Sequence, residues 1–181
     1  HIMERAPQSM KGKTTGRLVA AGLVIFLIIL IVLEDRGECD MVQDIKKSVL
    51  AGTWYPGDPE RLRADILSYL AKVPGEKEGG TIVALVSPHA GLVYSGQVAA
   101  FGYRQIEGKS CDSVIVIGPS HRAYFRGASV YDRGGFETPL GVVPVDVELA
   151  GALLARDEIL AFRPEAFAQE NSIEMQLPFL Q

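Results

Sequence analysis

The chain has 181 residues, of which 48% are hydrophobic, and a formal net charge of −4 at pH 7. This length and composition supply enough material for one domain core, but not clearly for two. The negative charge gives no electrostatic argument for a nucleic-acid partner. The two cysteines, Cys39 and Cys111, form neither a CxxC pair nor a disulfide framework. The composition thus argues against nucleic-acid binding and against a disulfide scaffold.

The first hydrophobic feature is an uninterrupted apolar run over residues 18–33. Together with its small and basic neighbours, it approaches the ~20 residues that span a bilayer. No small-residue cleavage site follows, so we prefer an uncleaved transmembrane anchor to a cleaved secretory signal. The basic tail over residues 1–17 carries a net charge of +3, which by the positive-inside rule keeps it in the cytoplasm. We expect a single-pass, membrane-anchored protein with an extracytoplasmic domain, or a cytoplasmic one if the run is not inserted.

The polar residues 34–47 are interpreted as a linker, and residues 48–181 as the domain. An entry segment then carries Trp54, the only tryptophan, which by its position is either a core residue or part of a pocket wall. Asp58 and Pro59 are typical of a helix start, because aspartate caps the first turn and proline fits the first helical position. Apolar residues continue at helical spacing as far as Pro74-Gly75, where we expect this helix to end.

Two similar stretches dominate the rest of the chain. Residues 82–86 and 113–117 are apolar and rich in β-branched side chains, which predicts strands buried on both faces. The first leads to His89 and the second to His121, the only histidines besides His1. In open parallel sheets, ligands bind beyond the carboxyl ends of strands, so we expect both imidazoles to face one crevice.

The remaining elements complete an α/β pattern. A helix is predicted from Ser95 through Ile106, with its larger apolar residues Val98, Phe101 and Tyr103 buried. Shorter strands are expected over 128–131 and 136–145, with a turn at Thr138–Gly141 in the second stretch. Asp146 is expected to cap a further helix. We therefore predict a mixed, mostly parallel sheet flanked by helices.

Two converging imidazoles suit a transition metal, because imidazole is the commonest protein ligand for such ions. A third ligand is needed, and Glu170 or Glu174 is the nearest candidate for a two-histidine, one-carboxylate set. Tyr94 and Ser120 are candidates for hydrogen-bond donors in the same crevice. The alternative is that each histidine serves loop structure, with its ring nitrogens bonded to nearby backbone groups.

Other chemistries have weaker support. Ser87 or Ser120 beside a histidine allows a nucleophilic pair, but the chain has no Gly-x-Ser-x-Gly elbow. The stretch from Gly91 to Gly96 lacks the lysine and the glycine spacing of a phosphate-binding loop. We therefore expect no nucleotide cofactor.

Five ordered motifs resemble the Memo family, labelled AmmeMemoRadiSam system protein B in prokaryotes. They are Trp54-Tyr55-Pro56, Ser87–Gly91 with Tyr94–Gly96, Gly118–His121, Thr138–Gly141 and Asn171–Pro178. The family fold is similar to that of class III extradiol dioxygenases. The resemblance implies a pocket metal, iron or copper, held by His89 and His121. It also implies that Trp54 and Tyr94 line the pocket. It implies a site more firmly than a reaction, which leaves oxidoreductase chemistry of the dioxygenase type an open expectation.

The sequence departs from the family pattern at Asn171, where the family usually has histidine. A carboxamide oxygen is a poorer ligand for iron or copper than imidazole, and Asn171 also suits a helix cap with Glu174 three residues on. A membrane anchor is not general in the family. The resemblance further implies strands, helices and a pocket cysteine beyond Gln181. We therefore expect a truncated chain with an exposed sheet edge and an uncovered core face.

Two hypotheses of different classes follow. The first is a metal-binding, oxidoreductase-like protein whose site includes His89 and His121, with Trp54, Tyr94, Ser120, Asn171 and Glu174 around it. The second is a module that binds a peptide or a small molecule in the same pocket without catalysis. Near-stoichiometric iron or copper favours the first, and tight ligand binding to a metal-free pocket favours the second.

Overall fold

The structure is a computed structural model, and it describes residues 44–75 and 79–181. These residues belong to one unit of the chain, Gln43–Gln181. The helices of the described part are α2 (Pro59–Ala71), α3 (Leu92–Ile106), α4 (Val147–Leu154), α5 (Leu177–Leu180) and the 3₁₀ turns η1 (Pro164–Ala166) and η2 (Glu174–Gln176). The strands are β1 (Ile45–Lys46), β2 (Ala128–Ser129), β3 (Gly135–Thr138), β4 (Gly141–Pro144) and β5 (Leu160–Ala161).

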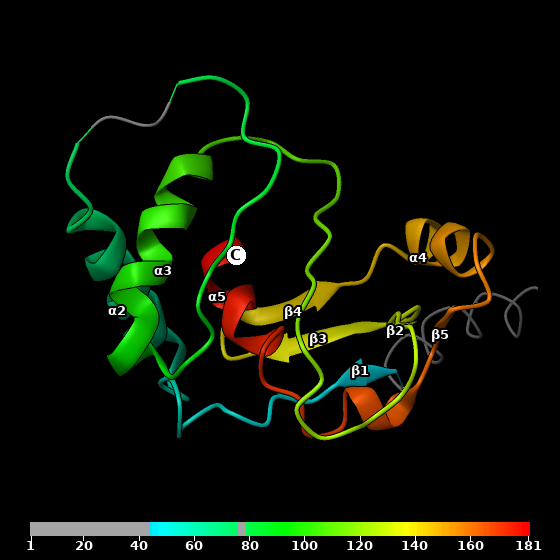
Figure 1. The fold of residues 1–181 in the computed structure, drawn as a ribbon. Helices are drawn as coiled ribbons and strands as arrows, with labels where there is room; N and C mark the ends of the chain where they lie inside the picture. Colours follow the sequence, from blue (N-terminus) through cyan, green and yellow to red (C-terminus); the bar gives the residue numbers. More distant parts are fainter. Residues whose placement is uncertain (1–43, 76–78) are drawn as a thin grey trace, which may run out of the picture. The chain divides into compact units, whose positions relative to one another are not determined.

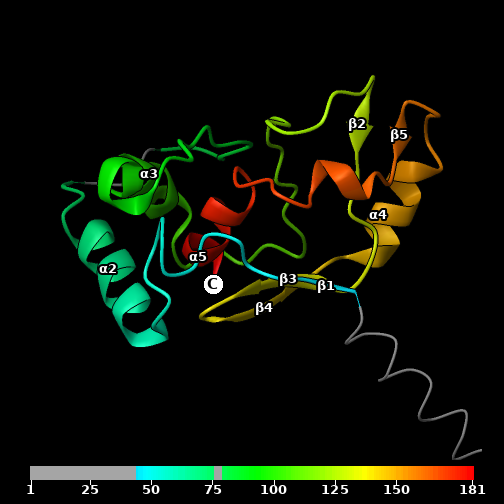
Figure 2. The same ribbon diagram turned by 90° about the horizontal axis from the view of Figure 1, so that it is seen from below.

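Helices α2 and α3 lie side by side at one end of this unit, and α5 packs against both (Figures 1 and 2). Helix α2 begins as predicted: the Asp58 side chain accepts a hydrogen bond from the backbone N–H of Arg61, and Pro59 is its first residue. Its apolar residues Leu62 and Ile66 are buried in the core. The capping and the apolar spacing therefore specify this helix locally.

Helix α3 differs from the prediction in its start and in its buried face. It begins at Leu92, three residues before Ser95, and its small residues Ser95, Gly96, Ala99 and Ala100 are buried. A side chain added at Gly96 would overlap the ring of Tyr69 in α2, so the close approach of the helices requires a small residue there. Val98 and Phe101 are exposed, although Tyr103 is buried as expected. Because close packing at Gly96 selects a small residue, Val98 and Phe101 lie on the exposed side of the helix.

The β structure consists of two small sheets in the described residues. Strand β1 pairs in parallel with β3, and β3 pairs with β4 in an antiparallel hairpin that places Phe136 opposite Val143. The hairpin turns at Thr138–Gly141, where the sequence predicted a turn. Strands β2 and β5 form a separate parallel pair. The sheets are thus mixed, but β1 falls inside the predicted linker 34–47, of which residues 34–43 lie outside the described part.

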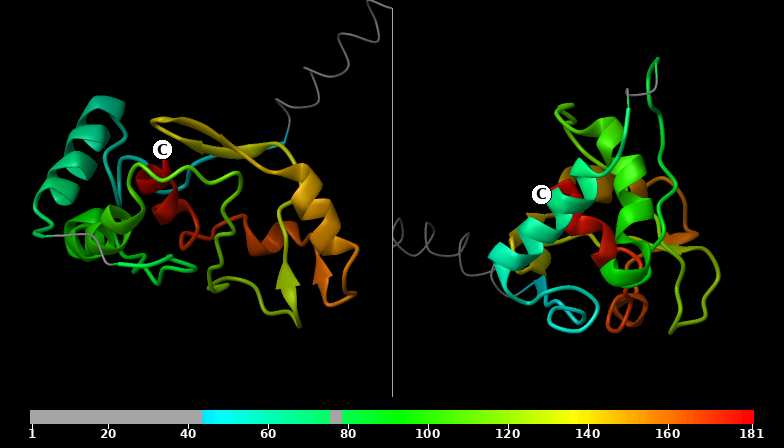
Figure 3. Two further views of the ribbon diagram at one scale, coloured as in Figure 1. Left: turned by 90° about the horizontal axis from the view of Figure 1, so that it is seen from above. Right: turned by 90° about the vertical axis from the view of Figure 1, so that its left-hand side faces the viewer.

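The two predicted buried strands are not formed. Residues 82–86 and 113–117 belong to no helix or strand, as the long connections before α3 and after it show (Figures 1 and 3). Val83 is 93% exposed and Ile117 is 89% exposed. A strand requires a hydrogen-bonded neighbour as well as apolar side chains, and these runs have no ladder partner among residues 44–75 and 79–181. The prediction of one mostly parallel sheet built on them was wrong.

The core has two parts joined by the end of the chain. One part contains Leu50, Tyr55, Leu62, Ile66, Leu92 and Met175, and the other contains Phe136, Ala166, Phe167 and Leu177. Met175 in η2 and Leu177 in α5 place the segment 170–177 between the helical end and the β hairpin, which Figure 1 shows in orange to red. This segment therefore contacts most of the elements that carry the predicted site.

The predicted membrane anchor is contradicted. Its residues, 18–33, lie outside the described part, and no helix within residues 44–75 and 79–181 is long and apolar enough to cross a membrane. The longest, α3, has 15 residues, whereas a spanning helix needs about 20. The expectation of a membrane-anchored, extracytoplasmic domain is therefore withdrawn.

Candidate functional site

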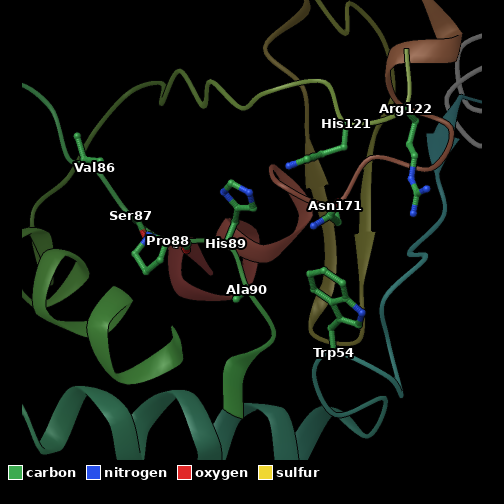
Figure 4. Close-up of a pocket in the computed structure, with 9 residues that line it drawn as sticks. All are labelled: Trp54, Val86, Ser87, Pro88, His89, Ala90, His121, Arg122 and Asn171. Atoms are coloured by element: carbon green, nitrogen blue, oxygen red, sulfur yellow. Dashed lines mark hydrogen bonds between the residues drawn. The ribbon is translucent and has the colours of Figure 1, made fainter. Parts of the chain in front are cut away.

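Two of the three histidines meet in one open pocket with a volume of about 820 Å³ (Figure 4). The pocket is lined by Trp54, Val86, Ser87, Pro88, His89, Ala90, His121, Arg122 and Asn171. These residues come from the turn before α2, from the extended stretch before α3, and from two loops. Four segments that are far apart in the sequence therefore line the same pocket.

The imidazoles of His89 and His121 face each other across this pocket. Their ring centroids are 5.2 Å apart, with an angle of 63° between the ring planes. Figure 4 shows the His121 ring pointing toward His89, with the Asn171 side chain below the two rings. The convergence of the two histidines that the sequence predicted is present, although the strands expected to carry them are not.

Glu170 is the direct partner of His121. Its Oε1 lies 2.9 Å from Nδ1 of His121, and its Oε2 accepts the backbone N–H of His121 at 2.8 Å. The backbone N–H groups of Asn171 and Ser172 donate to Oε1, both at 2.8 Å. Burial by itself raises the pKa of this carboxyl, but the hydrogen bonds from His121 and Ser172 outweigh burial and lower the pKa to about 2. Glu170 is therefore ionised at neutral pH.

Ser172 fixes the loop in front of His121. Its Oγ donates to the carbonyl oxygen of Pro119 at 3.2 Å, and the side chain is buried. A methyl group at Gly118 would overlap Ser172 Oγ, so the backbone of this loop approaches Ser172 as closely as only glycine allows. The glycine of the motif Gly118–His121 thus has a packing reason.

Glu174 holds the segment before Trp54. It is 2% exposed, and it accepts hydrogen bonds from Ser48 Oγ and Tyr55 Oη, both at 2.6 Å. The backbone N–H groups of Val49 and Leu50 also donate to it, and Lys46 Nζ lies 3.4 Å from Oε2. Burial raises its pKa, but the hydrogen bonds, led by those of Ser48 and Tyr55, lower the pKa below its ordinary value. Burial and the Glu174 carboxylate also raise the pKa of Tyr55.

Gln176 fixes the stretch before His89. Its Nε2 donates to the carbonyl oxygens of Pro88 at 3.2 Å and Ser172 at 3.3 Å. Its Oε1 accepts from Tyr103 Oη at 2.8 Å, and burial raises the pKa of Tyr103 to about 12. Glu170, Ser172, Glu174 and Gln176 are all buried polar residues. Each bonds a different part of the pocket wall or its support.

The structure brings together four of the predicted site residues and leaves three outside the pocket. Trp54, His89, His121 and Asn171 line it. Tyr94 is 85% exposed on α3, and Ser120 donates its hydroxyl to the carbonyl of Ala123 at 2.8 Å. Glu174 lies in the core, where its oxygens are occupied by the donors described above. None of these three side chains is among the pocket-lining residues.

The predicted third metal ligand is also not found in the described part of the chain. Glu170 and Glu174 both direct their oxygens at other partners, and no group of three or more His, Cys, Asp and Glu side chains there is arranged to hold a metal ion. Sequence reasoning missed Arg122 in the pocket wall and Gln176 behind it. Arg122 follows the motif Gly118–His121 directly, and this position was the available signal.

Comparison with known proteins then identifies the family. Residues 46–181, three quarters of the chain, match the family model described as Memo-like protein. The chain belongs to the Memo family. It is 36% identical over 136 residues to a MEMO1 family protein of Thermoplasma acidophilum, an alignment that covers 75% of this chain and 50% of the relative.

Other members of the Memo family have similar sequence identity and coverage. A MEMO1 family protein of Saccharolobus solfataricus is 38% identical over 143 residues, covering 73% of this chain and 50% of the relative. One from Thermotoga neapolitana is 38% identical over 147 residues, covering 76% and 53%. The chain therefore spans about half the length of the curated relatives that it matches. The resemblance in the five sequence motifs is thus confirmed at the level of the family.

Proposed function

We propose that the pocket binds a divalent transition metal ion through the imidazoles of His89 and His121. The observation that carries the proposal is the position of the two rings, 5.2 Å apart in one pocket. At metal–nitrogen distances of about 2.0–2.1 Å, two imidazoles on tetrahedral positions have ring centroids roughly 5 Å apart. The observed separation of the ring centroids therefore fits a shared ion.

The donor set present fits such an ion in part. Imidazole nitrogens suit iron, copper and zinc, whereas the Asn171 carboxamide offers only an oxygen. No third His, Cys, Asp or Glu in residues 44–75 and 79–181 is arranged to ligate an ion with the pair, so further positions belong to Asn171, water or a bound molecule. A metal with open positions supplies Lewis-acid or redox chemistry when it is bound. We therefore also propose oxidoreductase activity of the dioxygenase type, as an activity of the whole Memo domain.

The test is calorimetric titration of the metal-free chain with Fe²⁺ (under anaerobic conditions), Cu²⁺ and Zn²⁺. We expect about one equivalent to bind, and His89→Ala or His121→Ala to weaken binding more than tenfold, which is about 1.4 kcal/mol per decade. The matched control is His1→Ala, because the chain has only three histidines and a terminal histidine can also bind Cu²⁺. Metal binding that is lost in His1→Ala but is unchanged when both His89 and His121 are replaced by alanine would contradict the proposal.

The alternative function is binding of a small molecule or a peptide without a metal. It is supported by the absence of a third imidazole, thiolate or carboxylate ligand among the described residues, and by Trp54 and Arg122 in the pocket wall. An aromatic ring and a guanidinium together favour an anionic or aromatic ligand. A chain that takes up none of the three metals but binds such ligands in a Trp54-dependent manner supports this function instead.

A further inference from the structure

We infer that Glu170 is a positioning residue, which fixes the protonation pattern of the His121 ring so that Nε2 presents its lone pair to the pocket. In a neutral imidazole, one nitrogen carries the proton and the other accepts or binds a ligand. The contact with Glu170 decides between the two. The consequence for metal binding rests on the function proposed above, whereas the state of the ring does not.

Glu170 is surrounded by hydrogen-bond donors. Three backbone N–H groups, those of His121, Asn171 and Ser172, donate to its two oxygens at 2.8 Å. The side chain is only 5% exposed, so water does not compete for these positions. A backbone N–H can only donate, and this arrangement therefore matches an ionised carboxylate that accepts on both oxygens.

The fourth contact of the same carboxylate is with the ring of His121. Nδ1 of His121 lies 2.9 Å from Oε1 and 3.1 Å from Oε2. An unprotonated Nδ1 at this distance would set two lone pairs against each other, in a place where burial makes an unpaired acceptor costly. Nδ1 must therefore carry the proton and donate it to Glu170. In the neutral ring, Nε2, at the far end of the ring that points toward His89 in Figure 4, is then the nitrogen without a proton.

Glu170 also fixes the position of the His121 ring. Its Oε2 accepts the backbone N–H of His121 itself, so one carboxylate bonds both the main chain and the ring of the same residue. Such a double contact limits rotation of the imidazole toward solvent, although His121 is partly exposed. Glu170 does not line the pocket, and it acts only through His121. A carboxylate behind a metal-binding histidine orients the ring and raises its basicity.

The test reads the ring directly, in the metal-free full-length chain labelled with ¹⁵N. Long-range ¹H–¹⁵N spectra at about pH 8, where imidazole is mostly neutral, distinguish a protonated ring nitrogen from an unprotonated one. The His121 signals are assigned by their loss in His121→Gln. We expect the form protonated at Nδ1. A His121 ring protonated mainly at Nε2 in the unmodified chain would overturn the inference, and this result does not depend on any variant folding.

The second measurement compares Glu170→Gln with Glu165→Gln, a matched change at an exposed glutamate five residues earlier. We expect Glu170→Gln to increase the share of His121 protonated at Nε2 and to weaken Zn²⁺ binding by about 10–100-fold. Glu165→Gln should change neither, and Glu170→Asp should restore part of both. A folded Glu170→Gln chain whose His121 ring keeps its proton on Nδ1 would show that Glu170 does not set this state.

The two measurements separate this inference from the proposed function. A chain that shows the expected ring state but binds no metal refutes the metal site and leaves the positioning role of Glu170 in place. A chain that binds Zn²⁺ through both histidines with the opposite ring state refutes the positioning role alone.

Discussion

The side-chain amide of Gln176 donates to the carbonyl oxygen of Pro88 at 3.2 Å, one residue before His89. Six residues before Gln176, Glu170 bonds both the ring and the backbone of His121. The same short segment therefore holds the two histidines from behind. The buried polar residues at 170, 172, 174 and 176 act as a scaffold for the pocket, and the structure gives none of them a place in its wall.

The Gln176 contact can be tested by Gln176→Met, which keeps the length of the side chain and removes its polar atoms. We expect the free energy of unfolding to fall by about 1–3 kcal/mol, because Tyr103 Oη and the Pro88 carbonyl lose a buried partner. Zn²⁺ affinity should also fall, because the stretch before His89 is released. The measurements are urea unfolding and calorimetric Zn²⁺ titration.

The matched control is Gln97→Met on α3, where Nε2 donates to the carbonyl of Tyr69 at 3.0 Å. This bond joins α3 to α2 and lies outside the pocket wall, so its loss should lower stability without changing Zn²⁺ affinity. Equal losses of affinity in both variants would show that the effect of Gln176 on the pocket is only a general loss of stability.

The Glu174 cluster makes a prediction about pH. The pKa of Glu174 is lowered in the folded chain relative to its ordinary value of 4.5. A lowered pKa contributes stability above that value, and the contribution is lost as the pH falls below about 4.5. We expect Glu174→Gln to lower the free energy of unfolding by about 3–5 kcal/mol at neutral pH, because Lys46 and Tyr55 lose their charged partner.

The difference between the unmodified chain and Glu174→Gln should therefore shrink as the pH is lowered from 7 toward 3, since protonation makes Glu174 of the unmodified chain neutral, like the amide of the variant. Urea unfolding at several pH values measures it, with Glu165→Gln as a control that should show no such convergence. A difference that stays constant with pH would contradict the assignment of a charged, hydrogen-bonded Glu174.

The approach of Gly118 to Ser172 can be tested by a double-mutant cycle. Gly118→Ala places a methyl group against Ser172 Oγ and should cost about 1–3 kcal/mol, the usual range for overpacking. Ser172→Gly removes the obstacle, so the double variant should be more stable than the sum of the two single effects predicts. Additive effects, measured by urea unfolding, would mean that the two residues are not in contact.

Substitutions in the exposed apolar runs distinguish the structure, in which these runs are exposed, from the sequence-based prediction that they form buried strands. Val83→Lys and Ile117→Lys should each change the free energy of unfolding by no more than about 0.5 kcal/mol, because both side chains are almost fully exposed. Leu62→Ala, at a fully buried position, should cost about 2–5 kcal/mol in the same assay. Unfolding caused by either lysine would instead support buried strands at these positions.

Local features of the fold could be predicted from the sequence. The Asp58-Pro59 start of α2, the turn at Thr138–Gly141 and the cap at Asp146 each depend on a few neighbouring residues. The buried strands were predicted wrongly, because apolar runs indicate burial but not whether a ladder partner lies beside them. Periodicity also misled the interpretation of α3, whose packing depends on small residues facing Tyr69.

The site residues also divide into those that the sequence could place and those that it could not. His89 and His121 could be placed in one pocket, because their motifs repeat and both follow an apolar run. The roles of Glu170 and Glu174 could not, because a carboxylate in a motif can equally be a metal ligand or an acceptor of backbone N–H groups. Only the donors around each carboxylate distinguish these roles, and those donors come from residues such as Val49 and His121, which are remote in the sequence.

The central claim, that His89 and His121 share one ion, is tested most directly by titrating the ¹⁵N-labelled chain with Zn²⁺, a diamagnetic ion, and following both rings at once. We expect the ring nitrogen signals of His89 and His121 to change together and to reach their end points at the same single equivalent. The change at His121 should be on Nε2, with Nδ1 still protonated. Changes confined to one ring, or end points at different amounts of Zn²⁺, would contradict a shared site.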